Sequence, residues 1–143
     1  MRVKQISVFL ENKAGRLFEL TETLKGRNLN IRALSLADTT DFGILRMIVN
    51  QPEEAIAVLK EKGFAVAATE VLAVEVPDRP GGLAGVLGVL SDEGINVEYM
   101  YAFVEKKAGN AAVVLRVEEL EKASTLLSGA GVTILEAEEV YNL

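Results

Sequence analysis

The sequence predicts an α+β fold built from two ferredoxin-like modules, each with the element order β-α-β-β-α-β, an antiparallel sheet and helices on one face. The first supporting observation is an internal repeat. One constant shift along the chain superimposes Lys13-Ala14-Gly15-Arg16-Leu17 on Arg79-Pro80-Gly81-Gly82-Leu83 and Leu29-Asn30-Ile31 on Ile95-Asn96-Val97. The second is that strand-like and helix-like apolar patterns follow each other in the same order in both repeats. We therefore place module 1 at residues 1–70 and module 2 at residues 71–143.

Module 1 begins with residues 3–10, which alternate apolar and polar side chains as a strand does. Leu17, Leu20 and Leu24 then recur on one face of a helix, which a polar stretch at residues 25–28 ends.

Two further strands are expected at residues 31–37 and 44–49, which are apolar and rich in β-branched side chains. The residues between them are turn formers, so the two strands should make a hairpin. Pro52 suits the first turn of a second helix that stops near Gly63, and residues 64–69 supply a fourth strand.

Module 2 repeats this order, with strands expected at residues 72–76, 97–105, 111–117 and 132–140. Its first helix carries Leu83, Val86, Leu87 and Leu90, and its second lies around residues 120–127. The last strand of module 1 runs into the first strand of module 2 without an intervening Gly or Pro. We therefore expect the two modules to be rigidly apposed, with no flexible linker between them.

The composition excludes several classes of function. The chain has no cysteine and no histidine, which removes disulfides, thiolate nucleophiles, imidazole bases and most zinc sites. The formal charge of −6 disfavours nucleic-acid and membrane partners, because both need clustered Lys and Arg. The N-terminus has the pattern of a strand, not of a signal peptide, and no stretch suits a bilayer span. We expect a cytoplasmic protein that is not an enzyme and needs no cofactor or metal.

The turn from the first strand into the first helix of each module is a candidate binding site. Such a turn presents unpaired backbone N–H groups at the positive end of the helix dipole, which attracts a carboxylate. Gly15 and Gly81 lie at these turns, and Pro80 stiffens the second one. The alternative is that both glycines only allow tight turns.

Asparagines flank the first helix of module 1. Asn12 precedes Gly15 and Asn30 follows the helix, so we expect the two amides to converge beside the helix terminus. Together they would offer the donors and acceptors that an α-amino acid needs. Alternatively, Asn12 caps the helix and Asn30 makes a turn. The matching residues of module 2 are Asp78 and Asn96, so the two modules are not expected to be equivalent sites.

Two further groups of residues have alternative roles. Asp38, at the hairpin of module 1, is placed to meet a ligand ammonium or to form a local turn. Tyr99, Tyr101 and Phe103 alternate onto one strand face, where they pack against the other module or another subunit, or form a wall for a ligand. The glycines near residue 81 match no nucleotide-binding pattern.

The two turns, each followed by a leucine-rich helix and Leu/Ile-Asn-Ile/Val, resemble ACT domains. The resemblance covers nearly the whole chain twice, and it is particularly close to stand-alone tandem ACT proteins. It implies regulatory binding of an amino acid at interfaces between ACT modules. In serine-binding relatives, asparagines at the positions of Asn12 and Asn30 contact the ligand. Module 2 departs from this with Asp78, and module 1 has Ala14 in place of the usual proline.

The resemblance implies a non-catalytic amino-acid sensor that forms a homodimer. The alternative is a regulatory subunit that docks on a biosynthetic enzyme such as acetolactate synthase, whose small subunit also resembles an ACT domain. We expect ligand contacts from Asn12, Lys13, Ala14, Gly15, Arg16, Leu17, Asn30, Ile31 and Asp38 of module 1 and from Asp78, Pro80, Gly81, Gly82, Leu83, Asn96, Tyr99 and Tyr101 of module 2.

Overall fold

The computed structural model describes residues 2–38, 40–104 and 109–143, which form six strands and five helices. The elements in chain order are β1 (Val3–Glu11), α1 (Arg16–Gly26), β2 (Ile31–Asp38), β3 (Phe42–Val49), α2 (Pro52–Glu61), β4 (Ala65–Pro77), α3 (Gly82–Asp92), β5 (Val97–Ala102), β6 (Asn110–Val117), α4 (Leu120–Gly129) and α5 (Ala137–Tyr141). The predicted α+β class and the doubled module are confirmed. No helix of the described residues is long and apolar enough to cross a membrane.

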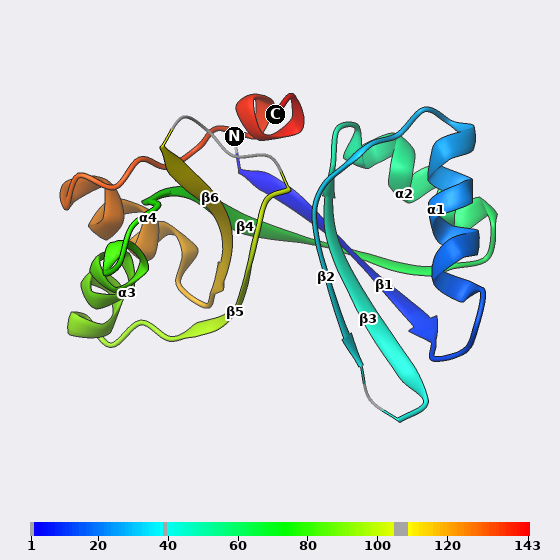
Figure 1. The fold of residues 1–143 in the computed structure, drawn as a ribbon, viewed down its shortest axis with the longest axis horizontal. Helices are drawn as coiled ribbons and strands as arrows, with labels where there is room; N and C mark the ends of the chain where they lie inside the picture. Colours follow the sequence, from blue (N-terminus) through cyan, green and yellow to red (C-terminus); the bar gives the residue numbers. More distant parts are fainter. Residues whose placement is uncertain (1, 39, 105–108) are drawn as a thin grey trace.

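The strands form one antiparallel sheet in the order β2-β3-β1-β4-β6-β5 (Figure 1). Strand β4 belongs to both modules, because its first part pairs with β1 and its second part pairs with β6. The change of partner falls between Val71, opposite Val3, and Leu72, opposite Leu115. The two separate strands expected here are therefore one continuous strand, which supports the expectation of rigidly apposed modules.

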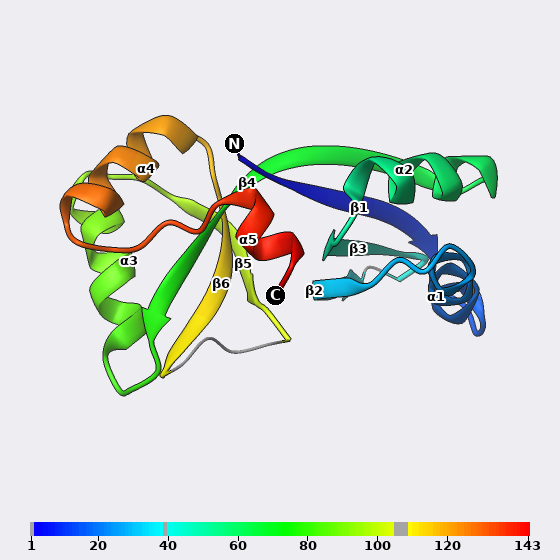
Figure 2. The ribbon, with the colours of Figure 1, turned by 90° about the horizontal axis from the view of Figure 1, so that it is seen from above.

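Each module covers one face of its part of the sheet with two helices (Figure 2). In module 1, Leu20 and Leu24 of α1 and Leu59 of α2 are fully buried against β1 and β3. Leu17, which the helical spacing placed on the same face, remains partly exposed. In module 2, Leu90 of α3 packs with the corresponding apolar core below α3 and α4. Leu83 of α3, which was predicted on the same face, is 38% exposed, so the pattern predicts the buried sides of both helices except at their first leucine.

A third apolar core lies between the modules, on the sheet faces that the helices do not cover. It contains Val3 of β1, Ile48 of β3, Val71 of β4 and Tyr101 of β5. In Figure 2, α1 to α4 lie on the two outer sides of the molecule, these sheet faces turn toward each other, and α5 lies between the modules. The edges β2 and β5 also meet, through an antiparallel bridge between Ala33 and Phe103.

The strand expected at residues 132–140 is wrong. This segment makes an isolated bridge between Ile134 and Val74 and then forms α5. Glu136 and Glu139 form a reciprocal capping box at the start of α5, and Ala137 and Val140 are buried at a spacing of three residues. The helix therefore satisfies its own first turn. The expected strand at residues 97–105 ends at Ala102, and its last residue lies outside the described part of the chain.

Candidate functional site

The two glycine turns have the predicted backbone geometry. Gly15 precedes α1 with φ 90°, and Gly81 precedes α3 with φ 85°, which is the left-handed region that glycine favours. Neither helix has a side-chain hydrogen bond at its cap, so Asn12 is not the cap of α1. Gly82 is needed for another reason, because a Cβ there would lie 2.0 Å from the carbonyl oxygen of Pro77.

The loop before α1 is attached to the β2–β3 hairpin. The backbone N–H of Asn12 donates to the carbonyl of Asp41 at 2.8 Å, and its side-chain amide donates to that of Thr40 at 3.3 Å. Lys13 and Arg16 both pair with Glu11, at 3.1 and 3.5 Å. The loop residues Asn12, Lys13, Ala14 and Gly15 are exposed, whereas Arg16 is partly buried.

Arg16 is held at the base of this loop by several neighbours. Its guanidinium lies 4.6 Å from the ring centroid of Phe64 and pairs with Glu19 at 2.8 Å. The buried Nε has no hydrogen bond within the described residues, since its contact with Glu11 is an ion pair at 3.5 Å. The guanidinium is thus positioned beside the N-terminus of α1 by aromatic stacking and by charge.

The structure does not bring Asn12 and Asn30 together within one module. Asn30 precedes β2, and Ile31 pairs with Val49 at the end of the sheet where β1 begins. Asn12 follows β1 at the opposite end, where Asp38 pairs with Gly43. The length of β2 separates the two asparagines by roughly 25 Å. The backbone N–H of Asn30 donates to Oδ1 of Asn50 at 2.9 Å.

Strand β2 connects these two ends and forms the outer edge of module 1. Among the described residues, its outer side is met only near Ala33, by the Phe103 bridge and by the N–H of Val104, which donates to the carbonyl of Arg32 at 3.0 Å. The remaining edge carries exposed apolar side chains, and it lies on the same side of the sheet as α1. On β2 these side chains are Leu34 and Leu36 (50% exposed), and Leu17 and Phe18 (67% exposed) of α1 are exposed as well.

The matching residues of module 2 border three pockets. Asp78, Pro80 and Leu83 line a pocket of about 410 Å³ beside β6, and Gly81 and Gly82 line another of about 310 Å³ on the other side of the turn. At the opposite end of the module, Asn96 and Tyr99 line a third pocket of about 560 Å³. As in module 1, the turn and the second asparagine are therefore not adjacent.

The aromatic strand contacts module 1 through a buried glutamine that sequence reasoning missed. Gln5 of β1 is 0% exposed, and its side-chain N–H group donates to the hydroxyl of Tyr99 at 2.7 Å. The hydroxyl of Tyr101 donates to Oε1 of Gln5 at 2.6 Å. The Nε2 of Gln5 also lies 3.3 Å from Oγ of Ser7. We call Gln5, Ser7, Tyr99 and Tyr101 the intermodule network.

Two features indicate how closely this network is packed. Burial raises the pKa of Tyr101 above its ordinary value, so its hydroxyl stays protonated and remains a donor. The guanidinium of Arg46 on β3 lies 3.9 Å from the ring centroid of Tyr99. Tyr99 and Tyr101 therefore pack against the other module, which is one of the two roles predicted for them. Strand β1 also carries Lys4 and Ser7, so a polar residue at position 5 gave no distinct sequence signal.

The described residues contain no group of three or more acidic side chains placed to hold a metal ion. The two ends of β2 offer groups that can form hydrogen bonds or ion pairs with a small molecule. These groups are the backbone N–H groups at a helix N-terminus, side-chain amides and a nearby guanidinium.

Comparison with known proteins places these features in context. The family model described as an ACT domain pair matches residues 1–143. The chain is similar to the solved structure of protein BT0572 from Bacteroides thetaiotaomicron, with 46% sequence identity and a TM-score of 0.94 over 100% of this chain and 98% of that one. It is also similar to the ligand-free regulatory subunit of aspartate kinase from Thermus thermophilus, with 16% identity and a TM-score of 0.64 over 91% and 93% of the two chains. The latter likeness concerns the fold alone. No curated protein sequence matches the chain.

Proposed function

Because the chain belongs to the ACT domain pair family, we propose that it is a non-catalytic regulatory protein that binds an amino acid at an interface between ACT modules of two copies. The observation that carries this proposal is the position of the candidate residues. The glycine turn with Asn12 and the second asparagine, Asn30, lie at opposite ends of one exposed edge strand, β2.

A two-fold arrangement resolves this separation. When the β2 edges of two copies lie antiparallel, the Asn30 end of one copy faces the Asn12 end of the other. Each site then combines the glycine turn of one copy with Asn30 of its partner. The ligand carboxylate meets the N–H groups at the N-terminus of α1, and its ammonium meets amide oxygens or the exposed carboxylate of Asp38.

Exposed apolar side chains favour the same arrangement. Leu34 and Leu36 lie along the open part of β2, and Leu17 and Phe18 lie on α1. Large apolar side chains grouped on a surface mark a contact with another protein. A second module seated here buries these side chains and gives the open strand edge a neighbour.

Module 2 is proposed to be a different kind of site. It has Asp78 where module 1 has Asn12, and a carboxylate there repels the carboxylate of an amino acid. We therefore propose one preferred type of ligand site, formed mainly by module 1 residues.

The proposal is tested by thermal shift measurements with each of the twenty amino acids at millimolar concentration. A ligand that binds only the folded state raises the melting temperature. For the amino acid that gives a shift, Asn12→Ala and Asn30→Ala should each weaken binding by about 10-fold or more, because each removes a hydrogen bond to a charged group. Asn142→Ala, at an exposed asparagine of the C-terminal segment, is the matched control. The proposal fails if no amino acid shifts the melting temperature.

The alternative function is a regulatory subunit that docks on an amino-acid biosynthetic enzyme such as acetolactate synthase. One observation favours it: Phe9 (52% exposed) and Phe42 (54% exposed) lie on the sheet face of module 1 that the helices do not cover. Ile44, Ala37 and Ala65 continue this apolar surface across the neighbouring strands. Co-purification with a large catalytic chain that Phe9→Lys abolishes, without loss of amino-acid binding, would support this alternative.

A further inference from the structure

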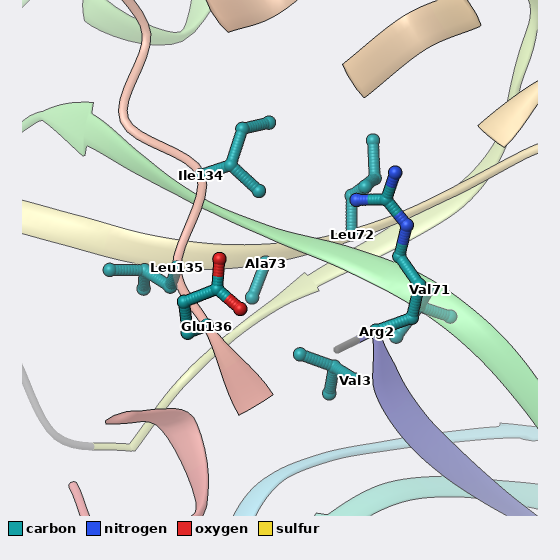
Figure 3. Close-up of a pocket in the computed structure, with 8 residues that line it drawn as sticks. All are labelled: Arg2, Val3, Val71, Leu72, Ala73, Ile134, Leu135 and Glu136. Atoms are coloured by element: carbon teal, nitrogen blue, oxygen red, sulfur yellow. The ribbon is translucent and has the colours of Figure 1, made fainter. Parts of the chain in front are cut away.

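Arg46 on β3 is a partly buried cation without an acceptor among the described residues. The other partly buried arginines each pair with a carboxylate or donate to an oxygen, and they are Arg2, Arg16, Arg32 and Arg116. Arg2, for example, lines the pocket between β1 and the C-terminal tail (Figure 3) and is held there by Glu121 at 2.8 Å. The guanidinium of Arg46 stacks on Tyr99, but no hydrogen bond or ion pair holds it within the described part of the chain. Because a partly buried charge without a counter-charge is unfavourable, Arg46 indicates a place where an anion can bind.

No carboxylate of the surrounding strands compensates this charge. On the sheet face of module 1 that the helices leave uncovered, Arg46 lies in register between Ser7 of β1 and Ser35 of β2. Within the described strands of module 1, the acidic side chain on this face is Glu11, which already forms two ion pairs. It follows Ser7 by four residues, roughly 13 Å, which exceeds the screening length at physiological salt. The acidic residue of β5, Glu98, pairs with another arginine at 3.4 Å.

The amide of Gln5 orients two hydroxyl groups on the same face. Its side-chain N–H groups donate to the hydroxyl oxygens of Tyr99 and Ser7, at 2.7 and 3.3 Å. Each hydroxyl therefore directs its own hydrogen away from Gln5, and the structure shows no acceptor for either hydrogen among the described residues. Because the two oxygens are bonded to diverging N–H groups of one nitrogen, they lie about 5 Å apart, close enough for a single ligand group to accept from both.

These donors are accessible from the exposed part of the face. Ser7, Arg46 and Tyr99 are all partly exposed. Ala67, opposite Ser7 on β4, is exposed, and so is Phe9 (52% exposed), two residues farther along β1. A ligand can therefore reach the two hydroxyls and the guanidinium and still contact an apolar surface.

The chemistry of this group selects a carboxylate without an ammonium. Donors without an acceptor bind an oxygen anion, and one guanidinium balances the single negative charge of a carboxylate. An ammonium would lie beside the guanidinium of Arg46, which repels it. It would also find no free amide oxygen, because Oε1 of Gln5 already accepts from the hydroxyl of Tyr101 at 2.6 Å.

We propose that Arg46, Ser7 and Tyr99 form a binding site for a small aliphatic carboxylic acid that has no ammonium group. The carboxylate accepts from the guanidinium and from both hydroxyls, and the aliphatic part lies on Phe9 and Ala67. Arg46 and Ser7 belong to module 1 and Tyr99 belongs to module 2, so the ligand joins the two modules. The site is contained within one chain and takes another ligand class than the proposed amino-acid site, so it does not depend on that site.

The test measures amide chemical shifts of the full chain by NMR during titration with four probes. They are 4-methylpentanoate, its neutral amide 4-methylpentanamide, L-leucine, which adds an ammonium to the same skeleton, and inorganic phosphate. We expect 4-methylpentanoate to shift the amides of Ser7, Arg46 and Tyr99 and to bind at least about 10-fold more tightly than its amide, since it gains hydrogen bonds with a charged group. L-leucine should bind at least about 3-fold more weakly, because its ammonium is repelled. Phosphate, which has no aliphatic part, should bind more weakly as well.

Matched variants separate binding from structure. Arg46→Gln should weaken binding of 4-methylpentanoate at least about 10-fold, whereas Arg2→Gln, with the same change of charge, should leave it unchanged. Because Arg46→Gln also removes the stacking on Tyr99, a second pair of variants leaves the guanidinium in place. Ser7→Ala should weaken binding at least about 5-fold, and Ser35→Ala, on the other side of Arg46, less than about 2-fold.

Four results overturn this proposal. The first is that 4-methylpentanoate does not shift these amides at tens of millimolar concentration. The second is that the amide, L-leucine or phosphate binds as tightly as the carboxylate. The third is that Ser7→Ala and Ser35→Ala weaken binding equally, because the hydroxyl would then not contact the ligand. The fourth is that Asn12→Ala abolishes the shifts, which would assign the acid to the proposed interface site.

Discussion

The intermodule network makes a quantitative prediction about stability. Replacing Tyr101 with Phe removes the hydroxyl that donates to Oε1 of Gln5, a side chain with 0% exposure. A buried acceptor left without a donor costs about 1–3 kcal/mol. For a chain of this length, such a loss lowers the melting temperature by about 3–10 °C. Urea unfolding followed by circular dichroism measures the free energy of unfolding directly.

Tyr99→Phe is the matched control, because it removes a hydroxyl from the same strand and the same network. The side-chain N–H group of Gln5 that bonds Tyr99 also lies 3.3 Å from Oγ of Ser7, so it keeps a partner. The cost should be smaller, about 0.5–1.5 kcal/mol. Adding Gln5→Met to the double Phe variant should recover most of the loss, since the buried amide of Gln5 is then absent and Ser7, which is only partly buried, can bond water. A loss in Tyr101→Phe no larger than that in Tyr99→Phe would refute this reasoning.

Four further predictions follow from particular contacts. Gly82→Ala should destabilise the fold by about 3 kcal/mol or more, since its Cβ meets the Pro77 carbonyl, whereas Gly85→Ala, with open space around it, should gain about 0.5–1 kcal/mol in chemical denaturation. Because burial raises the pKa of Tyr101 above 10.0, the folded state holds a proton that the unfolded chain releases. The contribution of this hydroxyl to the free energy of unfolding should be constant below about pH 10 and fall above it by up to about 1.4 kcal/mol per pH unit, and Tyr101→Phe should lessen the loss of stability in this range. Deleting residues 134–143 should expose the intermodule core and lower the melting temperature, with increased dye binding to apolar surface as the readout. Leu36→Asp should shift the sedimentation of the chain to that of a monomer, and Phe9→Asp should not.

The repeated module was predictable because its signals are local. Alternating apolar residues fixed the strands of module 1, and the spacing of Leu20 and Leu24 fixed the buried face of α1. The glycines at positions 15 and 81 were predicted at turns, and both have the positive φ that favours this residue. These features depend on neighbours within a few residues, which a sequence displays directly.

The tail was mispredicted because two local signals compete in it. Val132, Ile134 and Leu135 favour a strand, whereas Glu136 with Glu139 favours a capped helix start. The helix prevails because Ala137 and Val140 bury themselves against the intermodule core only at helical spacing. Apolar periodicity in the sequence did not show that these side chains would pack into the core between the two modules.

The positions of the two asparagines beside the first helix were predicted, but the distance between them was not. Asn12 and Asn30 flank α1, and a helix of eleven residues separates its two ends by about 16 Å. Asn12 and Asn30 therefore lie far apart in one module, although both are near β2. The intermodule network was not predictable, since Gln5, Tyr99 and Arg46 meet only when the two halves of the sheet face each other.

The most direct test of the central claim mixes two variants that each lack one half of the proposed site. Asn12→Ala and Asn30→Ala are each expected to lose amino-acid binding when measured alone by calorimetry. In an equal mixture that exchanges partners, a mixed dimer has one site with both asparagines and one with neither, so about a quarter of all sites should regain binding. If the mixture regains no binding while its copies exchange, the site is not shared between two copies and the account is contradicted.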